Sequence, residues 1–146
     1  VYIRTTPEKL WDAITNGALT KQYFFGGTLN AGPLAAGSPM TYRDDDGNVL
    51  TDGKVLEADP PRKLVQTWIA AYGPENERDP ESKITWEITA LGEACKLAVI
   101  HEHPDGDTAT AKGTVTGWPI ILSGLKTLVE TGKPLDIKFP EEAATA

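Results

Sequence analysis

Residues 115–129 have the sequence VTGWPIILSGLKTLV, in which apolar side chains recur at the spacing of a helix. The apolar stripe advances by steps of three and four residues and consists of Val115, Trp118, Leu122, Leu125 and Val129. This spacing predicts one long amphipathic helix whose stripe packs against the rest of the protein. Gly132 and Pro134 favour its end. Pro119 predicts either a kink or the start of a C-terminal half of the helix.

The residues before this helix have the pattern of antiparallel strands joined by turns. Ile84, Trp86 and Ile88 alternate with polar residues, which predicts a strand with one buried face. The stretch Asp45-Asp46-Gly47-Asn48 predicts a hairpin turn. The predicted strands cover residues 28–31, 40–43, 49–58, 64–72, 84–91 and 96–103, with a polar loop at 73–80.

Two short helices are predicted near the start of the chain, after a short strand at residues 1–5. Thr6-Pro7-Glu8 has the residue types preferred at a helix N-terminus, so the first helix is expected over residues 7–15, ending at Asn16-Gly17. Thr20 is expected to cap a second helix that continues through Phe25 and stops at Gly26-Gly27. The order of a strand, two short helices, antiparallel strands and a long helix predicts an α+β fold, with the helices on one face of a curved sheet.

The composition is typical of one globular domain. The chain has 146 residues, and we expect a single domain over residues 1–140 and a flexible C-terminal tail at 141–146. A net charge of −7 and scattered Lys and Arg residues exclude a nucleic-acid-binding surface. No stretch approaches the roughly 18 apolar residues of a membrane span, and no export signal opens the chain, so we expect a cytoplasmic protein. The single cysteine, Cys95, excludes an internal disulfide and a cysteine-based zinc site.

The chain resembles the START-like superfamily called SRPBCC and, within it, the family of homologues of the heat-shock protein 90 ATPase activator. The matching stretches are IRTTPEKLWDAIT (3–15), YF (23–24), LVQTW (64–68), the segment 95–102 and GWPIILSGLK (117–126). The resemblance implies a helix-grip fold, in which a curved antiparallel β-sheet wraps around the long C-terminal helix. It also implies a cavity between the sheet and that helix.

The aromatic residues are the candidates for the wall of such a cavity. The 4 tryptophans all fall in predicted helices or strands, where they fill the core or line a ligand pocket. Glycines 113, 117 and 124 on the long helix allow close approach of the sheet or leave room for a ligand. The segment before Gly26-Gly27 is expected to act as a lid. The predicted ligand-binding residues are Tyr23, Phe24, Phe25, Trp68, Trp86, His101, Trp118 and Leu122.

Candidate metal-binding and catalytic groups are few. His101 and His103 share one face of a strand, but no third ligand follows at a recognisable spacing, so no metal site is predicted. His101 also shares that face with apolar residues, and is therefore either a hydrogen-bonded core histidine or the polar contact of a ligand. The carboxylates at 44–46 lack the calcium-loop pattern. Cys95 has no evident partner base, so no catalytic residue and no cofactor is predicted.

Three functional hypotheses follow from these observations. The first is a small START-like domain that binds a hydrophobic or aromatic small molecule, such as a lipid, and that is not an enzyme. The second, implied by the resemblance, is a polyketide cyclase- or aromatase-type enzyme, for which His101, Tyr23 and Tyr42 are the available acid–base groups. The third, also implied by the resemblance, is a partner of the heat-shock protein 90 chaperone. The sequence leaves open whether the chain forms a homodimer.

Overall fold

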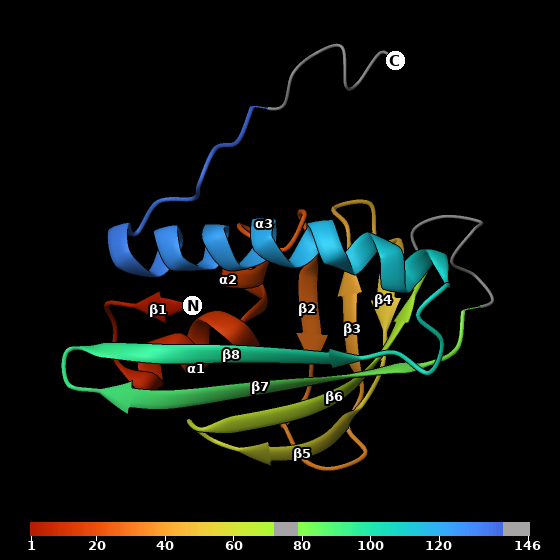
Figure 1. Ribbon diagram of the computed structural model, residues 1–146, viewed down its shortest axis with the longest axis horizontal. Helices are drawn as coiled ribbons and strands as arrows, with labels where there is room; N and C mark the ends of the chain where they lie inside the picture. The colour runs from red at the N-terminus through yellow and green to blue at the C-terminus, as the bar shows by residue number, and fades with distance from the viewer. Residues whose placement is uncertain (72–78, 139–146) are drawn as a thin grey trace.

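The computed structural model describes residues 1–71 and 79–138, and consists of one long helix lying across a curved sheet (Figure 1). Most of the predicted loop at 73–80 and the whole predicted tail at 141–146 lie outside the described residues. In chain order the elements are β1 (Tyr2–Ile3), α1 (Pro7–Thr15), α2 (Gly17–Thr20), β2 (Thr28–Ala31), β3 (Met40–Arg43), β4 (Val49–Asp52), β5 (Val55–Asp59), β6 (Lys63–Ala70), β7 (Ser82–Leu91), β8 (Ala94–Glu102) and α3 (Ala109–Thr131).

The eight strands form one antiparallel sheet in the order β1-β8-β7-β6-β4-β3-β2, and β5 also pairs with β6. β6 is shared by the two halves of the sheet, since its residue Leu64 pairs with Trp86 of β7 and its residue Ala70 pairs with Thr51 of β4. Strands β2–β4 run at a steep angle to β7 and β8, so the sheet curves around one side of α3 (Figure 1). The fold is therefore the predicted α+β helix-grip fold, with two short helices after the first strand.

The hydrophobic core lies between α3 and the concave face of the sheet. The buried face predicted for β7 is confirmed, since Ile84, Trp86 and Ile88 are all buried, whereas Thr85 on the opposite face is buried as well. From the helix side, Ile121 and Leu125 are buried in the same core cluster. Within the described residues, no helix is both long enough and apolar enough to cross a membrane.

The long C-terminal helix is confirmed, and both of its ends have regular caps. At its start the Thr108 hydroxyl accepts a hydrogen bond from the Ala111 N–H at 3.0 Å. At its end Gly132 adopts the left-handed conformation with φ 78°, and its N–H donates to the Leu128 carbonyl at 2.8 Å. Pro119 lies inside the helix, so it removes one backbone donor from the middle of α3.

The predicted stripe of α3 is wrong at its first residue. Val115 is 74% exposed, whereas Leu125 is fully buried. At 3.6 residues per turn, Val115 lies about 80° from Leu125 and about 120° from Ile121 around the helix. Because the buried face is centred on Ile121 and Leu125, Val115 points away from the sheet.

The predicted second helix is also wrong in position. α2 is a single turn that covers Gly17–Thr20, and it is capped by the Asn16 side chain, which accepts from the Ala18 N–H at 3.0 Å. Thr20 does not act as the cap but is buried, donating to the Gly27 carbonyl at 2.9 Å and accepting from the Leu29 N–H at 3.0 Å. Its hydroxyl thus closes the loop that carries the aromatic residues 23–25.

The single strand predicted over residues 49–58 is divided into β4 and β5 at Gly53. A Cβ atom at this position would lie 2.1 Å from the Thr67 carbonyl oxygen, so only glycine permits the close approach of the two backbones. The division lets β4 pair with the end of β6 and β5 with its beginning.

Candidate functional site

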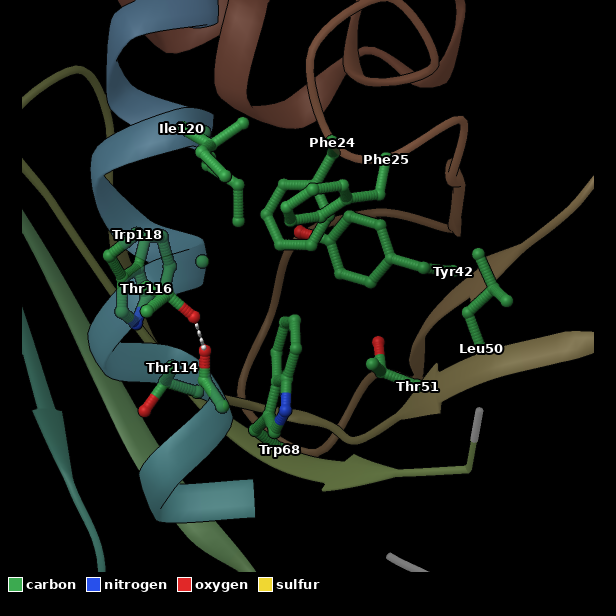
Figure 2. A pocket seen from close by; sticks show the side chains of 13 residues that line it. Phe24, Phe25, Tyr42, Leu50, Thr51, Trp68, Thr114, Thr116, Trp118 and Ile120 are labelled. Atoms are coloured by element: carbon green, nitrogen blue, oxygen red, sulfur yellow. Dashed lines mark hydrogen bonds between the residues drawn. The ribbon is translucent and has the colours of Figure 1, made fainter. Parts of the chain in front are cut away.

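A pocket of about 510 Å³ lies between α3, the aromatic loop after α2 and strands β3, β4 and β6 (Figure 2). Its described lining contains no Lys, Arg, His, Asp or Glu side chain. The lining residues are Phe24, Phe25, Tyr42, Leu50, Thr51, Trp68, Gly113, Thr114, Thr116, Gly117, Trp118, Ile120 and Ile121.

Aromatic rings that contact one another form the walls. Phe24 stacks on Tyr42 with 4.5 Å between ring centroids, and it lies 5.5 Å from Trp68. Across the pocket Trp118 lies 6.4 Å from Trp68 and 6.2 Å from Phe24. These large, rigid surfaces suit a flat apolar ligand.

The strand register explains why these side chains meet. Tyr42 of β3 pairs with Thr51 of β4, and Thr51 pairs with Ala70 of β6. Trp68 lies two residues before Ala70, so its side chain points to the same face of the sheet. The row Tyr42, Thr51 and Trp68 is therefore fixed by backbone pairing.

Two buried polar atoms in this row have no hydrogen-bond partner among the described residues. They are the Thr51 hydroxyl and the indole N–H of Trp68, and the two residues are 2% and 5% exposed. Such groups are rare in folded proteins because burying them without a partner costs free energy.

His101 joins the sheet to α3 through both nitrogens of its ring. Its Nδ1 accepts from the Trp118 indole N–H at 3.0 Å, and its Nε2 lies 2.8 Å from the Ser82 hydroxyl. The Ser82 hydroxyl in turn donates to the Trp68 carbonyl at 3.2 Å. Since Nδ1 accepts, the proton of a neutral His101 is on Nε2. Burial, together with the nearby His103, lowers the pKa of His101 to about 3.

The structure brings only some of the predicted ligand-binding residues to the pocket. Phe24, Phe25, Trp68 and Trp118 line it. Trp86 packs edge-on against Trp118, with 5.4 Å between the ring centroids, and is not in the lining.

The remaining predicted residues also lie elsewhere. His101 is absent from the lining, and its two nitrogens are already engaged. Tyr23 lines a separate groove, and its hydroxyl donates to the Ala13 carbonyl at 2.7 Å. Leu122 is half-buried against the core.

The ligand-binding residues predicted from the sequence did not include Tyr42, Leu50, Thr51 and the helix residues around Trp118; Tyr42 was considered only as an acid–base group. Strands β3 and β4 have four residues each, which is too short for a clear alternation. Of the glycines predicted to leave room for a ligand, Gly113 lines the pocket, and so does Gly117. A Cβ there would meet only the Phe25 ring, at 3.8 Å, so this position leaves space beside the pocket.

Phe25 lies at the mouth of the pocket in an uncommon conformation. It has φ 50°, in the left-handed region that a bulky residue rarely adopts, and is 59% exposed. Phe25 lines both the pocket and the neighbouring groove. The exposed ring therefore lies where the pocket and the groove adjoin.

The described residues offer little for acid–base or metal chemistry at the pocket. Tyr42 is the one ionisable side chain in the described lining. Burial raises the pKa of its phenol, and this effect exceeds that of a hydrogen bond with Gln66, which lowers the pKa. Within residues 1–71 and 79–138, no three His, Cys, Asp or Glu side chains are grouped closely enough to hold a metal ion.

Comparison with protein families gives one match over most of the chain. The model of the family described as "Activator of Hsp90 ATPase homolog 1-like protein" matches residues 4–130. No curated protein matches the sequence.

Solved structures share the fold at low sequence identity. The Aha1 dimer from Colwellia psychrerythraea superposes with a TM-score of 0.69 at 20% identity, covering 91% of this chain and 94% of that one. A Plasmodium falciparum protein described as an HSP90 activator gives 0.68 at 21% identity, covering 91% and 93%. CalU16 from Micromonospora echinospora gives 0.70 at 18% identity, covering 90% and 74%.

Proposed function

Because this chain belongs to the Activator of Hsp90 ATPase homolog 1-like family, we propose that it is a small cytoplasmic domain that binds a hydrophobic or aromatic small molecule between its sheet and α3. The observation that carries the proposal is the pocket of about 510 Å³ with aromatic, uncharged walls. Small-molecule sites typically have about 300–1,000 Å³ and mostly apolar linings.

The unfilled volume itself supports a ligand. Protein interiors are normally packed to the density of organic crystals, with few voids larger than a water molecule. Here α3 contributes Gly117 to the pocket wall, although glycine in a helix costs about 0.8–1 kcal/mol relative to alanine. A space retained at that cost is more readily explained by binding than by packing.

Filling the pocket from the helix tests the proposal. The Gly117→Leu variant places a side chain where the nearest atom to a new Cβ is the Phe25 ring, 3.8 Å away. We expect the variant to be more stable than the wild type, since leucine has the higher helix propensity, and to lose binding. Binding is measured by thermal shift and native mass spectrometry with lipids, flavonoids and aromatic polyketides.

A matched control separates loss of space from a change in the helix. Val115→Leu enlarges a side chain on the same helix that is 74% exposed and outside the lining. It should bind like the wild type. Wild-type affinity in Gly117→Leu, or no ligand for the wild type in the whole screen, would overturn the proposal.

A second candidate function is contact with a chaperone of the heat-shock protein 90 class. The description of the family and that of the Plasmodium falciparum fold neighbour, an HSP90 activator, favour it. It is tested by adding the chain to such a chaperone and measuring ATP hydrolysis. An unchanged rate, with no complex in analytical ultracentrifugation, would exclude it.

The cyclase-type alternative receives less support from the site. That chemistry needs a group that exchanges protons near neutral pH. In the described lining the ionisable group is Tyr42, and burial moves its pKa away from neutrality.

A further inference from the structure

The two unpartnered polar atoms of the pocket wall are the Thr51 hydroxyl and the Trp68 indole N–H. Both residues are more than nine-tenths buried, and both belong to the lining. Leaving a buried hydrogen-bonding group without a partner costs free energy. Retaining two of them side by side therefore needs a reason beyond stability.

The sheet places the two groups next to each other. Thr51 pairs with Ala70, and Trp68 is the diagonal neighbour two residues along β6, within reach for a large side chain. Figure 2 shows the indole nitrogen on the edge of Trp68 that is turned toward Thr51. Rotation about the Cβ–Oγ1 bond lets the hydroxyl proton of Thr51 turn toward an acceptor without moving the side chain.

The comparable groups nearby are all satisfied. The Trp86 indole N–H donates to the Gln66 side-chain oxygen at 2.7 Å, and that of Trp118 donates to His101 at 3.0 Å. On α3 the hydroxyls of Thr114 and Thr116 donate to helix carbonyls at 2.9 and 3.1 Å. Among the described lining residues, the buried side-chain groups that lack a hydrogen-bond partner are thus those of Thr51 and Trp68.

The chemistry of the two groups defines what they can hold. An indole N–H only donates, and a threonine hydroxyl donates as readily as it accepts. A carbonyl oxygen has two lone pairs and can accept from both donors at once. A carboxylate or phosphate is disfavoured, because the described lining has no cationic side chain and an unpaired buried charge is costly.

We propose that the ligand is an uncharged aromatic compound with a carbonyl oxygen, which accepts hydrogen bonds from Trp68 Nε1 and Thr51 Oγ1 while its rings pack against Phe24 and Trp118. This inference rests on the proposed binding function of the same pocket. It adds the polar group of the ligand and the side chains that recognise it.

The test compares two probes that differ only at one position, 9-fluorenone and fluorene. Their affinities are measured by isothermal titration calorimetry with the full chain. We expect fluorenone to bind the wild type more tightly, by about three- to tenfold, as a net hydrogen bond contributes about 0.5–1.5 kcal/mol. The charged analogue 9-fluorenone-4-carboxylate should bind more weakly than fluorenone.

Variants assign this preference to the two donors. Thr51→Val and Trp68→Phe should each reduce the ratio of fluorenone to fluorene affinity toward one. The ratio is the readout, because Trp68→Phe also removes part of the apolar wall and weakens the binding of both probes. Thr116→Val is the matched control, since its hydroxyl lines the same pocket but already donates to the Gly113 carbonyl. It should keep the wild-type ratio.

Nuclear magnetic resonance gives a readout at the donor itself. The indole proton of Trp68 should move downfield with fluorenone relative to fluorene, whereas those of Trp86 and Trp118, which already have acceptors, should not differ between the probes.

The outcomes separate the two proposals. Equal binding of both probes by the wild type, or a fluorenone preference that survives in both variants, overturns the carbonyl site and leaves apolar binding intact. Absence of binding by either probe counts against both.

Discussion

The indole N–H of Trp118 donates to Nδ1 of His101 across 3.0 Å, which links the middle of α3 to β8 through one side-chain hydrogen bond. The bond requires Nδ1 to carry a lone pair, so it exists only with a neutral imidazole. The His103 ring stacks on His101 with 4.0 Å between centroids, which further disfavours a charge there. The link between helix and sheet is therefore sensitive to protonation.

The stability of the protein should fall as the pH decreases from 7 to 5. Burial, and secondarily His103, lowers the pKa of His101 to about 3, against an ordinary value of 6.5. Between these values the unfolded chain binds the proton and the folded chain does not, so acid favours unfolding, by up to about 1.4 kcal/mol per pH unit for one proton. Urea denaturation at several pH values measures this slope.

The control for this pH dependence is the His101→Asn variant, which cannot titrate at this position. Its free energy of unfolding should vary less between pH 7 and 5 than that of the wild type. His103→Asn should have the smaller effect, because His103 is less buried and the pKa of its imidazole is lowered less. Equal slopes in wild type and His101→Asn would contradict the proposed role of the neutral imidazole.

The Thr51→Val variant should be more stable than the wild type. It replaces a buried hydroxyl that has no described partner by a methyl group of similar shape, so we expect a gain of about 1 kcal/mol. Chemical denaturation measures the gain, and Thr116→Val, at an exposed position, should gain nothing comparable. A clear loss of stability in Thr51→Val would show that the hydroxyl is satisfied in solution.

The core anchor of α3 should be Leu125 and not Val115. Leu125 is fully buried, and its truncation to alanine should cost about 2–5 kcal/mol. Val115→Ala truncates a side chain that is 74% exposed, and should change the stability by less than about 0.5 kcal/mol. If both variants lower the melting temperature equally, Val115 faces the core of the protein as Leu125 does, which would contradict this orientation of α3.

Removal of the Phe25 ring should open the pocket. The Phe25→Ala variant should both bind and release 9-fluorenone faster, because the ring lies at the mouth and is 59% exposed. Stopped-flow measurement of tryptophan fluorescence gives both rates. Tyr2→Ala, which removes an equally exposed aromatic ring outside the pocket, should leave the rates unchanged, and unchanged rates in Phe25→Ala would exclude a gate at this residue.

The fold could be predicted from sequence wherever a local pattern was long enough. The long helix α3, its end at Gly132 and the burial of Ile84, Trp86 and Ile88 depend on neighbours in the chain, so local patterns reveal them, although the predicted stripe wrongly included the exposed Val115. Thr20 was misassigned because its partners, Gly27 and Leu29, are brought to it by the tertiary fold.

The candidate site was predictable only in part, for the same reason. Phe24 and Trp118 could be proposed as pocket residues because they are large aromatics beside glycines. The role proposed for Thr51 depends on the lack of a hydrogen-bond partner for its hydroxyl among the described residues. A missing hydrogen bond cannot be recognised in a sequence. The engaged nitrogens of His101 likewise become visible only when Ser82 and Trp118 are placed around it.

Pro119 separates two parts of α3 whose side chains have different surroundings. The residues after it include the core anchors Ile121, Leu125 and Leu128, where substitution threatens folding. The turns before it supply pocket wall through Gly113, Thr114, Thr116, Gly117 and Trp118, none of which is buried. Substitutions at the exposed Gly113 and Thr116 can reshape the pocket at little cost in stability, whereas Trp118 also donates the hydrogen bond to His101. The shape of this part of the wall can therefore change while the core of α3 stays the same.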